Sequence, residues 1–181
     1  MPLKNNRTKY IVHLEVVKQQ FMKQITLQIN YTEYSATSQL PENDNKLIMK
    51  ARDAAQNAYA PYSGFRVGAA VLLQNGEIIT GNNQENAAYP SGLCAERTAL
   101  FYASAQYPKI PIVSIAISTL SVATSPSETA KPCGACRQVM AEYEDLAGKP
   151  LRILLDSSDR ILELNGIDSL LPLRFKKVDL K

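Results

Sequence analysis

Three cysteines place the strongest constraint on what this chain can fold into. Cys133 and Cys136 form a Cys-x-x-Cys pair, and Cys94 lies well before them in the sequence. An odd number of cysteines does not suit a framework of disulfide bonds, and in an intracellular protein this spacing indicates metal binding or redox chemistry. If the three thiols bind one ion, the fold must bring two distant segments of the chain together.

Both segments are predicted to begin a helix at the cysteine. At a helix N-terminus the free N–H groups and the helix dipole favour a thiolate. Cys136 follows Cys133 by about one helical turn, so both sulfurs can point the same way. Three converging thiolates predict a tetrahedral zinc site with one open position, which is typical of catalytic zinc. The alternatives are a structural zinc site completed by His13, the only histidine, and a thioredoxin-like redox pair.

Helical and strand patterns alternate along most of the chain. Apolar residues recur at helical spacing in some segments, and short β-branched runs bounded by turn residues predict strands in others. Asn75 and Gly76 favour a two-residue hairpin turn between two such runs. The expected helices are 44–59, 94–105 and 133–143, and the expected strands are 67–73, 78–79, 112–117, 151–155 and 161–164. This order predicts a layered α/β fold in which helices cover a mixed sheet.

The first forty residues differ from the rest, because they are rich in Asn, Gln, Thr and Tyr and contain no glycine. Residues 24–31 alternate between apolar and polar side chains, which predicts a strand. Residues 32–39 are expected to form a polar loop.

One domain boundary follows from this change in composition. We expect an N-terminal extension over residues 1–40, partly strand-like and partly disordered, and one domain over residues 41–181. The sequence from Met22 resembles the beginning of a strand-like extension, so we expect either that Met22 is the natural start or that residues 1–21 are a poorly ordered addition. The polar loop at 119–131 is expected to be exposed, and its role is left open.

Composition restricts the class of function. The chain is 45% hydrophobic and 20% charged, as in ordinary soluble globular proteins. No run of apolar residues approaches the length of a membrane span, and the N-terminus lacks the features of a signal peptide. The net charge of +3 is too slight, and the basic residues too scattered, to indicate nucleic-acid binding. We therefore expect a cytoplasmic protein that binds neither membranes nor nucleic acids.

Five separated motifs stand out along the chain. They are APYSGFRVGAA (60–70), NQENAAY (83–89), CAERTAL (94–100), PCGACRQ (132–138) and LLPLRF (170–175). The pattern Cys94-Ala95-Glu96 followed by a proline and Cys-x-x-Cys is the signature of zinc deaminases in their three-cysteine version. Together the five motifs resemble the cytidine deaminase family in its small, homotetrameric form. Larger dimeric relatives and polynucleotide editors of that family typically carry histidine at the first ligand position, so Cys94 itself indicates the small tetrameric class.

The resemblance implies a three-layer α/β/α fold around a central mixed sheet of five strands. It also implies one zinc ion per subunit, bound by the three cysteines, and hydrolytic deamination of cytidine and 2′-deoxycytidine in pyrimidine salvage. Glu96 would take a proton from the activated water, deliver it to N3 of the base and then protonate the leaving amino group. Arg97 would hydrogen-bond the ligand sulfurs and offset the charge of an all-thiolate site.

Further site residues are implied by their positions in the motifs. Asn83 and Glu85 match the pair that binds the ribose 3′-hydroxyl, and an amide with a carboxylate can satisfy a hydroxyl as donor and acceptor. Phe65 would pack on the pyrimidine face, and the backbone of Ala95 would contact the edge of the base. Tyr89 and Phe175 match residues that neighbouring subunits contribute in the tetramer, so that active sites are shared.

Three other functions compete with this interpretation. A sister deaminase could act on another small substrate such as a nucleoside analogue, although Asn83, Glu85 and Phe175 favour cytidine. A non-catalytic zinc or redox protein could use the same cysteines, but Glu96 beside an open metal position argues against it. An RNA or DNA editor would need a basic, aromatic-lined groove, which the sequence does not indicate.

Overall fold

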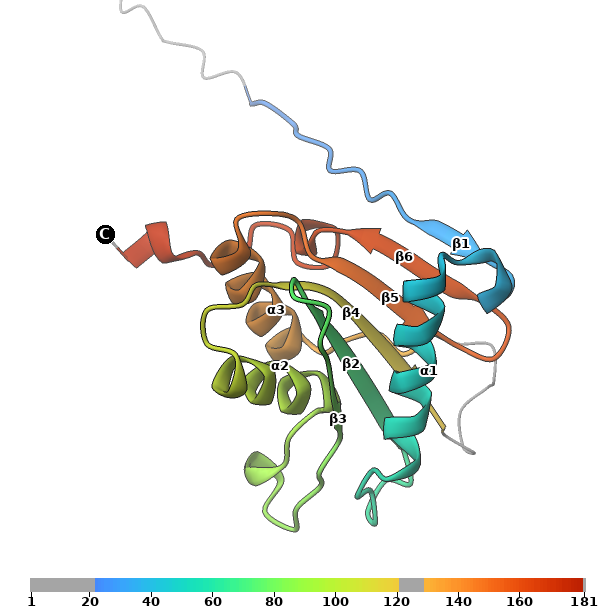
Figure 1. The fold of residues 1–181 in the computed structure, drawn as a ribbon. Coiled ribbons are helices and arrows are strands. Elements are labelled where there is room, and N and C mark those ends of the chain that lie inside the picture. The colour runs from blue at the N-terminus through green and yellow to red at the C-terminus, as the bar shows by residue number, and fades with distance from the viewer. Residues whose placement is uncertain (1–21, 121–128, 181) are drawn as a thin grey trace, which may run out of the picture.

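Within the residues that the structure describes, six strands form one mixed sheet in the order β1-β6-β5-β4-β2-β3 (Figure 1). The computed structural model describes residues 22–120 and 129–180. Neighbouring strands are antiparallel except β4 and β5, which are parallel. The strands are β1 (Thr32–Tyr34), β2 (Val67–Leu73), β3 (Ile78–Asn82), β4 (Ile112–Thr119), β5 (Arg152–Asp156) and β6 (Ile161–Asn165).

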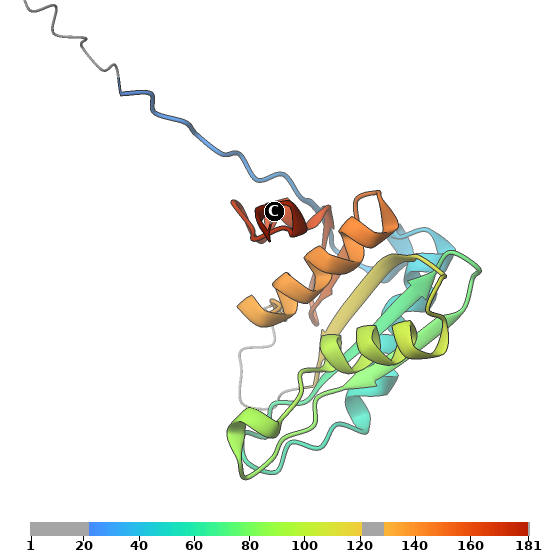
Figure 2. The same cartoon turned by 90° about the vertical axis from the view of Figure 1, so that its left-hand side faces the viewer.

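Three α-helices cover the two faces of this sheet. They are α1 (Glu42–Gln56), α2 (Ala95–Gln106) and α3 (Gly134–Ala147). The apolar face of α1 packs against one side of the sheet through buried residues such as Leu47 and Ile48. On the other side, α2 and α3 cover the sheet (Figure 2). They close the larger core, in which Leu100 and Met140 are fully buried. The predicted three-layer α/β/α architecture is therefore confirmed.

The sheet has six strands rather than the expected five. The additional strand, β1, lies where the sequence predicted a loop. Most of residues 22–31 were predicted to be a strand, but they pair with no strand in the part of the chain that the structure describes. Alternation shows only that one face of a segment is apolar; a strand also needs a partner edge. That edge is β6, where Thr32 is paired with Glu163 and the Tyr34 hydroxyl donates a hydrogen bond to the Glu163 carboxylate at 2.7 Å.

Helix α1 is shorter than the sequence pattern predicted. It begins at Glu42 with Pro41 as the N-cap, and Asp44, expected to be the cap, is buried inside the first turn. It ends at Gln56, three residues early, because the Tyr59 N–H donates to the Asn83 carbonyl and draws the chain toward β3. The other helices and strands form close to their predicted positions.

Several predictions fall on parts of the chain outside the described residues. They concern His13 as a ligand, the character of residues 1–21, and most of the 119–131 loop. Among the residues that are described, no helix combines the length and the apolar character that a membrane crossing requires.

Candidate metal centre and active site

The three cysteine sulfurs meet at the N-termini of two helices. Cys94 is the N-cap of α2, and Cys133 is the N-cap of α3, both with extended backbone conformation, as the sequence predicted. Cys136 lies in the first turn of α3 and is buried. Because α2 follows β3 and α3 follows β4, and both helices pack on the same face of the sheet, the fold brings the two segments together.

The spacing of the sulfurs fits a zinc ion. Cys94 Sγ and Cys133 Sγ are 3.9 Å apart, and Cys133 Sγ and Cys136 Sγ are 3.5 Å apart. All three sulfur atoms lie within 4.8 Å of one another. A tetrahedral zinc ion with Zn–S bonds of about 2.3 Å holds its sulfurs about 3.8 Å apart. The cluster therefore has the dimensions and the ligand type of a zinc site.

Electrostatics favour a cation in this cluster. Hydrogen bonding to Cys136 lowers the pKa of the Cys94 thiol to about 5, and the Arg97 guanidinium also lowers it, against the opposing effect of burial. Hydrogen bonding to Cys94 and burial raise the pKa of Cys136, because a second thiolate beside the first is unfavourable. A bound divalent cation would remove this conflict, because it displaces the remaining thiol protons and its charge stabilises all three thiolates together.

Arg97 lies against the first ligand. Its Nη2 donates to Cys94 Sγ at 3.7 Å, and its Nε is buried without a hydrogen-bond partner in the described part of the chain. An arginine remains charged even when partly buried, so it offsets negative charge at an all-thiolate site. The position that the sequence analysis gave to Arg97 therefore agrees with its observed contact.

Glu96 is the buried acid of the site. It follows Cys94 by two residues in the first turn of α2, and only 5% of the residue is exposed. Burial raises the pKa of its carboxyl, and the charge of Cys94 adds to this rise. Hydrogen bonds from its own backbone N–H and from Cys136 lower this pKa, but by less than burial raises it. A buried carboxyl beside a metal cluster, with a raised pKa and no ion-pair partner among the described residues, is suited to carry protons.

A cavity of about 260 Å³ opens beside the metal cluster. It is lined by Cys94 and Arg97 and by three of the predicted substrate residues, Asn83, Glu85 and Tyr89. Six other predicted residues do not line this cavity: Phe65, Ala95, Glu96, Cys133, Cys136 and Phe175.

Asn83 and Glu85 hold the segment between α1 and β2. Asn83 Oδ1 accepts from the Val67 N–H at 2.8 Å, and Asn83 Nδ2 donates to the Phe65 carbonyl at 2.9 Å. Glu85 accepts from the hydroxyl and the backbone N–H of Ser63, and hydrogen bonding to that hydroxyl is the main cause that lowers its pKa. Each side chain keeps unused capacity, because an amide has four hydrogen-bonding positions and a carboxylate about four.

The remaining predicted residues lie at different depths. Ala95 is fully buried at the start of α2, and Phe65 is half-buried in the segment held by Asn83. Tyr89 is 82% exposed and Phe175 is 58% exposed. Phe175 is nevertheless tied to the metal-bearing helix, because Gln138 Nε2 donates to its carbonyl at 3.0 Å.

Comparison with known proteins agrees with this geometry. A family model described as the cytidine and deoxycytidylate deaminase zinc-binding region matches residues 41–147. The chain belongs to the cytidine deaminase family. The sulfur cluster together with this match confirms the predicted zinc site at Cys94, Cys133 and Cys136.

Relatives in this family match most of the chain. A cytidine deaminase of Halalkalibacterium halodurans is 40% identical over 134 residues, which is 74% of this chain and 95% of that protein. A probable cytidine deaminase of Dictyostelium discoideum is 36% identical over 77% of this chain and 88% of that protein. The crystal structure of cytidine deaminase from Burkholderia pseudomallei matches with a TM-score of 0.61 and 39% identity, over 72% of this chain and 97% of that one.

One residue that supports the cytidine deaminase site was missed by the sequence analysis. Arg137 Nε donates to the Pro132 carbonyl at 2.8 Å, and Arg137 Nη1 donates to the Leu170 carbonyl at 2.8 Å. Arg137 thus fixes the backbone just before Cys133 and joins it to the C-terminal turn. No sequence signal distinguishes it from an arginine on an exposed helix face, since both of its partners are backbone carbonyls.

Proposed function

We propose that this protein catalyses the hydrolytic deamination of cytidine and 2′-deoxycytidine, releasing ammonia and forming uridine and 2′-deoxyuridine. The observation that carries the proposal is the buried Glu96 carboxyl beside a cluster of three cysteine sulfurs with the dimensions of a zinc site. Several relatives at 36–40% identity are named cytidine deaminases, which supports the substrate class.

The proposed mechanism divides the work between the metal and Glu96. When bound by the three cysteines, zinc supplies Lewis acidity and lowers the pKa of water, which makes water a nucleophile near neutral pH. Glu96 accepts the proton of the attacking water and delivers it to N3 of the base, which makes C4 more electrophilic. It then takes the second proton from the hydroxyl group that the attack leaves on C4 and gives it to the amino group, so that ammonia leaves and the C4 carbonyl forms. Burial that raises the pKa of Glu96 suits this role, because the group must both accept and release a proton.

Arg97 is proposed to tune the metal. Three thiolates donate much negative charge and would blunt the acidity of the ion, and the guanidinium that contacts Cys94 Sγ draws part of this charge away. Without Arg97 the site would bind zinc less tightly and activate water less strongly.

The sugar and the base are proposed to bind on the cavity side of the cluster. Asn83 and Glu85 line that cavity and have hydrogen-bonding positions left for a ribose 3′-hydroxyl. Phe65, on the segment that Asn83 holds, is proposed to pack on the pyrimidine ring, and the Ala95 backbone to contact its edge. Such a site would reject free cytosine, because its polar groups would be buried without partners.

A homotetramer with shared active sites is part of the proposal. Tyr89 and Phe175 are exposed aromatic residues, and their sequence positions match those that neighbouring subunits contribute. We further propose that residues 41–181 form the catalytic domain, and that the enzyme works in the cytoplasm, where thiols remain reduced. All three cysteines of the chain are free of disulfide bonds, in agreement with a reducing compartment.

One assay tests the proposed reaction. The purified protein, with its zinc content measured, is incubated with cytidine, 2′-deoxycytidine, cytosine and CMP, and loss of the cytosine chromophore is followed by absorbance. We expect turnover of both nucleosides, with free cytosine and CMP turned over far more slowly. Absence of turnover of either nucleoside at one zinc per chain would refute the proposal.

A further inference from the structure

An extended N-terminal arm precedes the sheet. The arm (residues 22–31) runs away from the body of the molecule before entering β1 (Figure 1). Its alternate apolar residues, Ile25, Leu27, Ile29 and Tyr31, are all between 52% and 72% exposed. The intervening residues 24, 26, 28 and 30 are polar. One face of the arm is therefore apolar, as in a surface that packs against another part of a protein, yet the described residues of the chain leave this face exposed.

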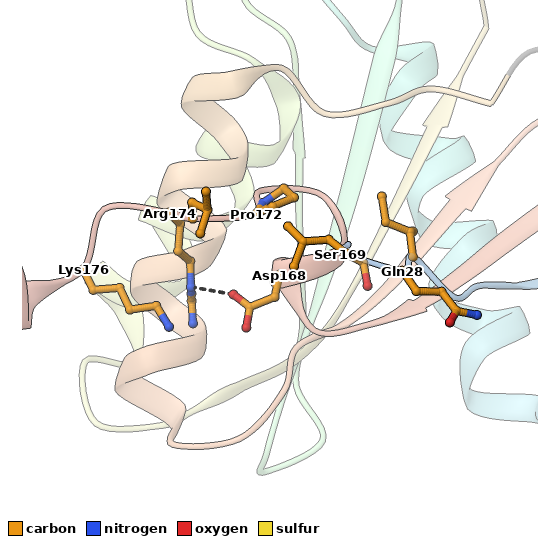
Figure 3. Close-up of a pocket in the computed structure, with 9 residues that line it drawn as sticks. Gln28, Asp168, Ser169, Pro172, Arg174 and Lys176 are labelled. Atoms are coloured by element: carbon orange, nitrogen blue, oxygen red, sulfur yellow. Dashed lines mark ion pairs between the residues drawn. The ribbon is translucent and has the colours of Figure 1, made fainter. Parts of the chain in front are cut away.

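A second apolar element lies opposite the arm. A cavity of about 460 Å³ is lined by Leu27 and Ile29 of the arm and by Pro172 and Leu173 of the C-terminal turn (residues 168–176). Figure 3 labels Gln28 of the arm and Pro172 of the turn among the residues at this cavity. Leu173 is 95% exposed, and its φ of 55° lies in the left-handed region, which a leucine rarely adopts. A strained backbone that presents a large apolar side chain to solvent indicates a surface that meets a partner.

The C-terminal turn is rigidly held, so the exposure of Leu173 is built into the fold. Arg174, whose side chain is only 5% exposed, donates to the Ala141 carbonyl at 3.1 Å and pairs with Asp145 at 2.9 Å. It also pairs with Asp168 at 3.0 Å, as the dashed line in Figure 3 shows. These contacts fix the residue beside Leu173 to α3 and to the start of the turn.

Reach and symmetry favour a second copy of the chain as the occupant. Ten extended residues span about 30 Å, which is roughly the diameter of a small domain, so the arm can cross a neighbouring subunit. A two-fold axis repeats each contact, so the arm of each copy would cover the C-terminal turn of the other.

The arm is an addition to the family domain. The family model begins at residue 41, and the Burkholderia enzyme matches over 97% of its own length while covering 72% of this chain. The C-terminal turn, in contrast, includes Phe175, which is proposed to complete a neighbouring active site. The arm therefore lies beside a segment that is already expected to face another subunit.

We propose that the arm and the C-terminal turn form an interface between two copies of this chain, in which the apolar face of one arm packs against the partner subunit's Leu173. The inference rests on the proposed oligomeric enzyme only for the placement of Phe175 at a subunit contact. It assigns to the N-terminal extension a role in holding the assembly together.

Photo-crosslinking tests which surface the arm contacts. A benzophenone amino acid replaces Ile25 in the full-length, zinc-loaded protein, and in a matched control it replaces Gln24 on the polar face of the arm. We expect Ile25 to give a covalent dimer on a denaturing gel, with the cross-linked peptide mapping to residues 168–176, and Gln24 to give at least fivefold less. Cross-links confined to one chain, or dimers that map elsewhere, would overturn the proposal.

Association measured by light scattering provides a second, independent test. The triple variant Ile25→Ser, Leu27→Ser, Ile29→Ser is compared with Gln24→Ser, Thr26→Ser, Asn30→Ser over a range of protein concentrations. We expect the first to raise the concentration at which subunits dissociate at least tenfold, and the control to leave it unchanged. Equal dissociation in the two variants would overturn the proposal.

Deamination is measured on the same samples, so that the two proposals can fail separately. If the apolar-face variant loses tight association but the wild-type chain does not deaminate cytidine, the proposed reaction is refuted and the interface stands. Full cytidine turnover together with arm variants that associate normally would refute the interface alone.

Discussion

Gly81 of β3 lies so close to Ala99 of α2 that a Cβ atom on the glycine would fall 2.5 Å from the Ala99 backbone nitrogen. The same Cβ would fall 2.9 Å from the Ala95 carbonyl oxygen. Strand and helix therefore touch through backbone atoms in the first two turns of α2. These turns follow Cys94 directly, and the first of them carries Glu96. The distance between sheet and helix, and with it the position of the first zinc ligand, depends on the absence of a side chain at this residue.

We predict that Gly81→Ala destabilises the fold and loosens the metal site. Neither backbone partner can move without shifting α2, so the substitution should lower the free energy of unfolding by about 3 kcal/mol. Urea unfolding with zinc present measures this loss, and zinc bound per chain should fall with it. Thr80→Ala, at the exposed neighbouring position on β3, is the control and should cost less than about 1 kcal/mol. Equal stability of the two variants would contradict the argument.

Arg97→Ala is predicted to weaken zinc binding without unfolding the protein. The guanidinium contacts Cys94 Sγ at 3.7 Å, and removing a group that supports a metal ligand typically lowers metal affinity about 10–100-fold. Competition with a chromophoric chelator measures the affinity, and circular dichroism checks the fold. Lys50→Ala, an exposed position on α1, serves as the charge-matched control. Unchanged zinc affinity together with unchanged turnover would show that Arg97 has no role at the metal.

Glu163 on β6 is predicted to make part of the stability dependent on pH. Partial burial acts to raise the pKa of its carboxyl, but hydrogen bonds from Arg152 and Tyr34 outweigh this effect and lower it below 4.5. A carboxyl with a lowered pKa in the folded state stabilises the protein above its ordinary pKa. That contribution disappears as the pH falls through the lowered value.

The Glu163→Gln variant isolates this effect. The pair with Arg152 is partly exposed, so the variant should lose about 1 kcal/mol of unfolding free energy at pH 7. The difference from wild type should shrink as the pH is lowered below 4.5. Glu142→Gln, at an exposed position on α3, should show no such convergence. A difference that stays constant from pH 7 to pH 3 would exclude the ion pair as its source.

Local patterns in the sequence predicted the parts of the fold that depend on local interactions. The Asn75-Gly76 turn forms the β2–β3 hairpin with Gly76 at a φ of 90°. Cys94 and Cys133 do begin helices, because the preference for a helix start is set by the residues immediately around it. These starts, together with the strands between them, were enough to predict where the three sulfurs meet.

Local sequence patterns could not predict interactions between residues that are distant in the chain. The choice of Thr32–Tyr34 as a strand depends on the free edge of β6, more than a hundred residues later in the chain. Arg137 joins Pro132 to Leu170 through backbone carbonyls, which have no sequence signature. Asn83 was predicted to bind ribose, but its bonds to Phe65 and Val67 show that it also shapes the cavity wall.

Glu96→Gln is predicted to keep both the fold and the zinc while losing catalysis. Glutamine has nearly the same size and fits the same buried position in α2, but it cannot carry a proton between water and the base. General acid–base groups contribute about 10²–10⁴-fold, so kcat on cytidine should fall by at least that factor. Zinc per chain, measured by atomic emission, should stay at the wild-type value, and the control Glu142→Gln should retain full turnover. Near-normal kcat in Glu96→Gln at full zinc would end the assignment of Glu96 as the proton carrier, because no other buried carboxyl among the described residues adjoins the cysteine cluster.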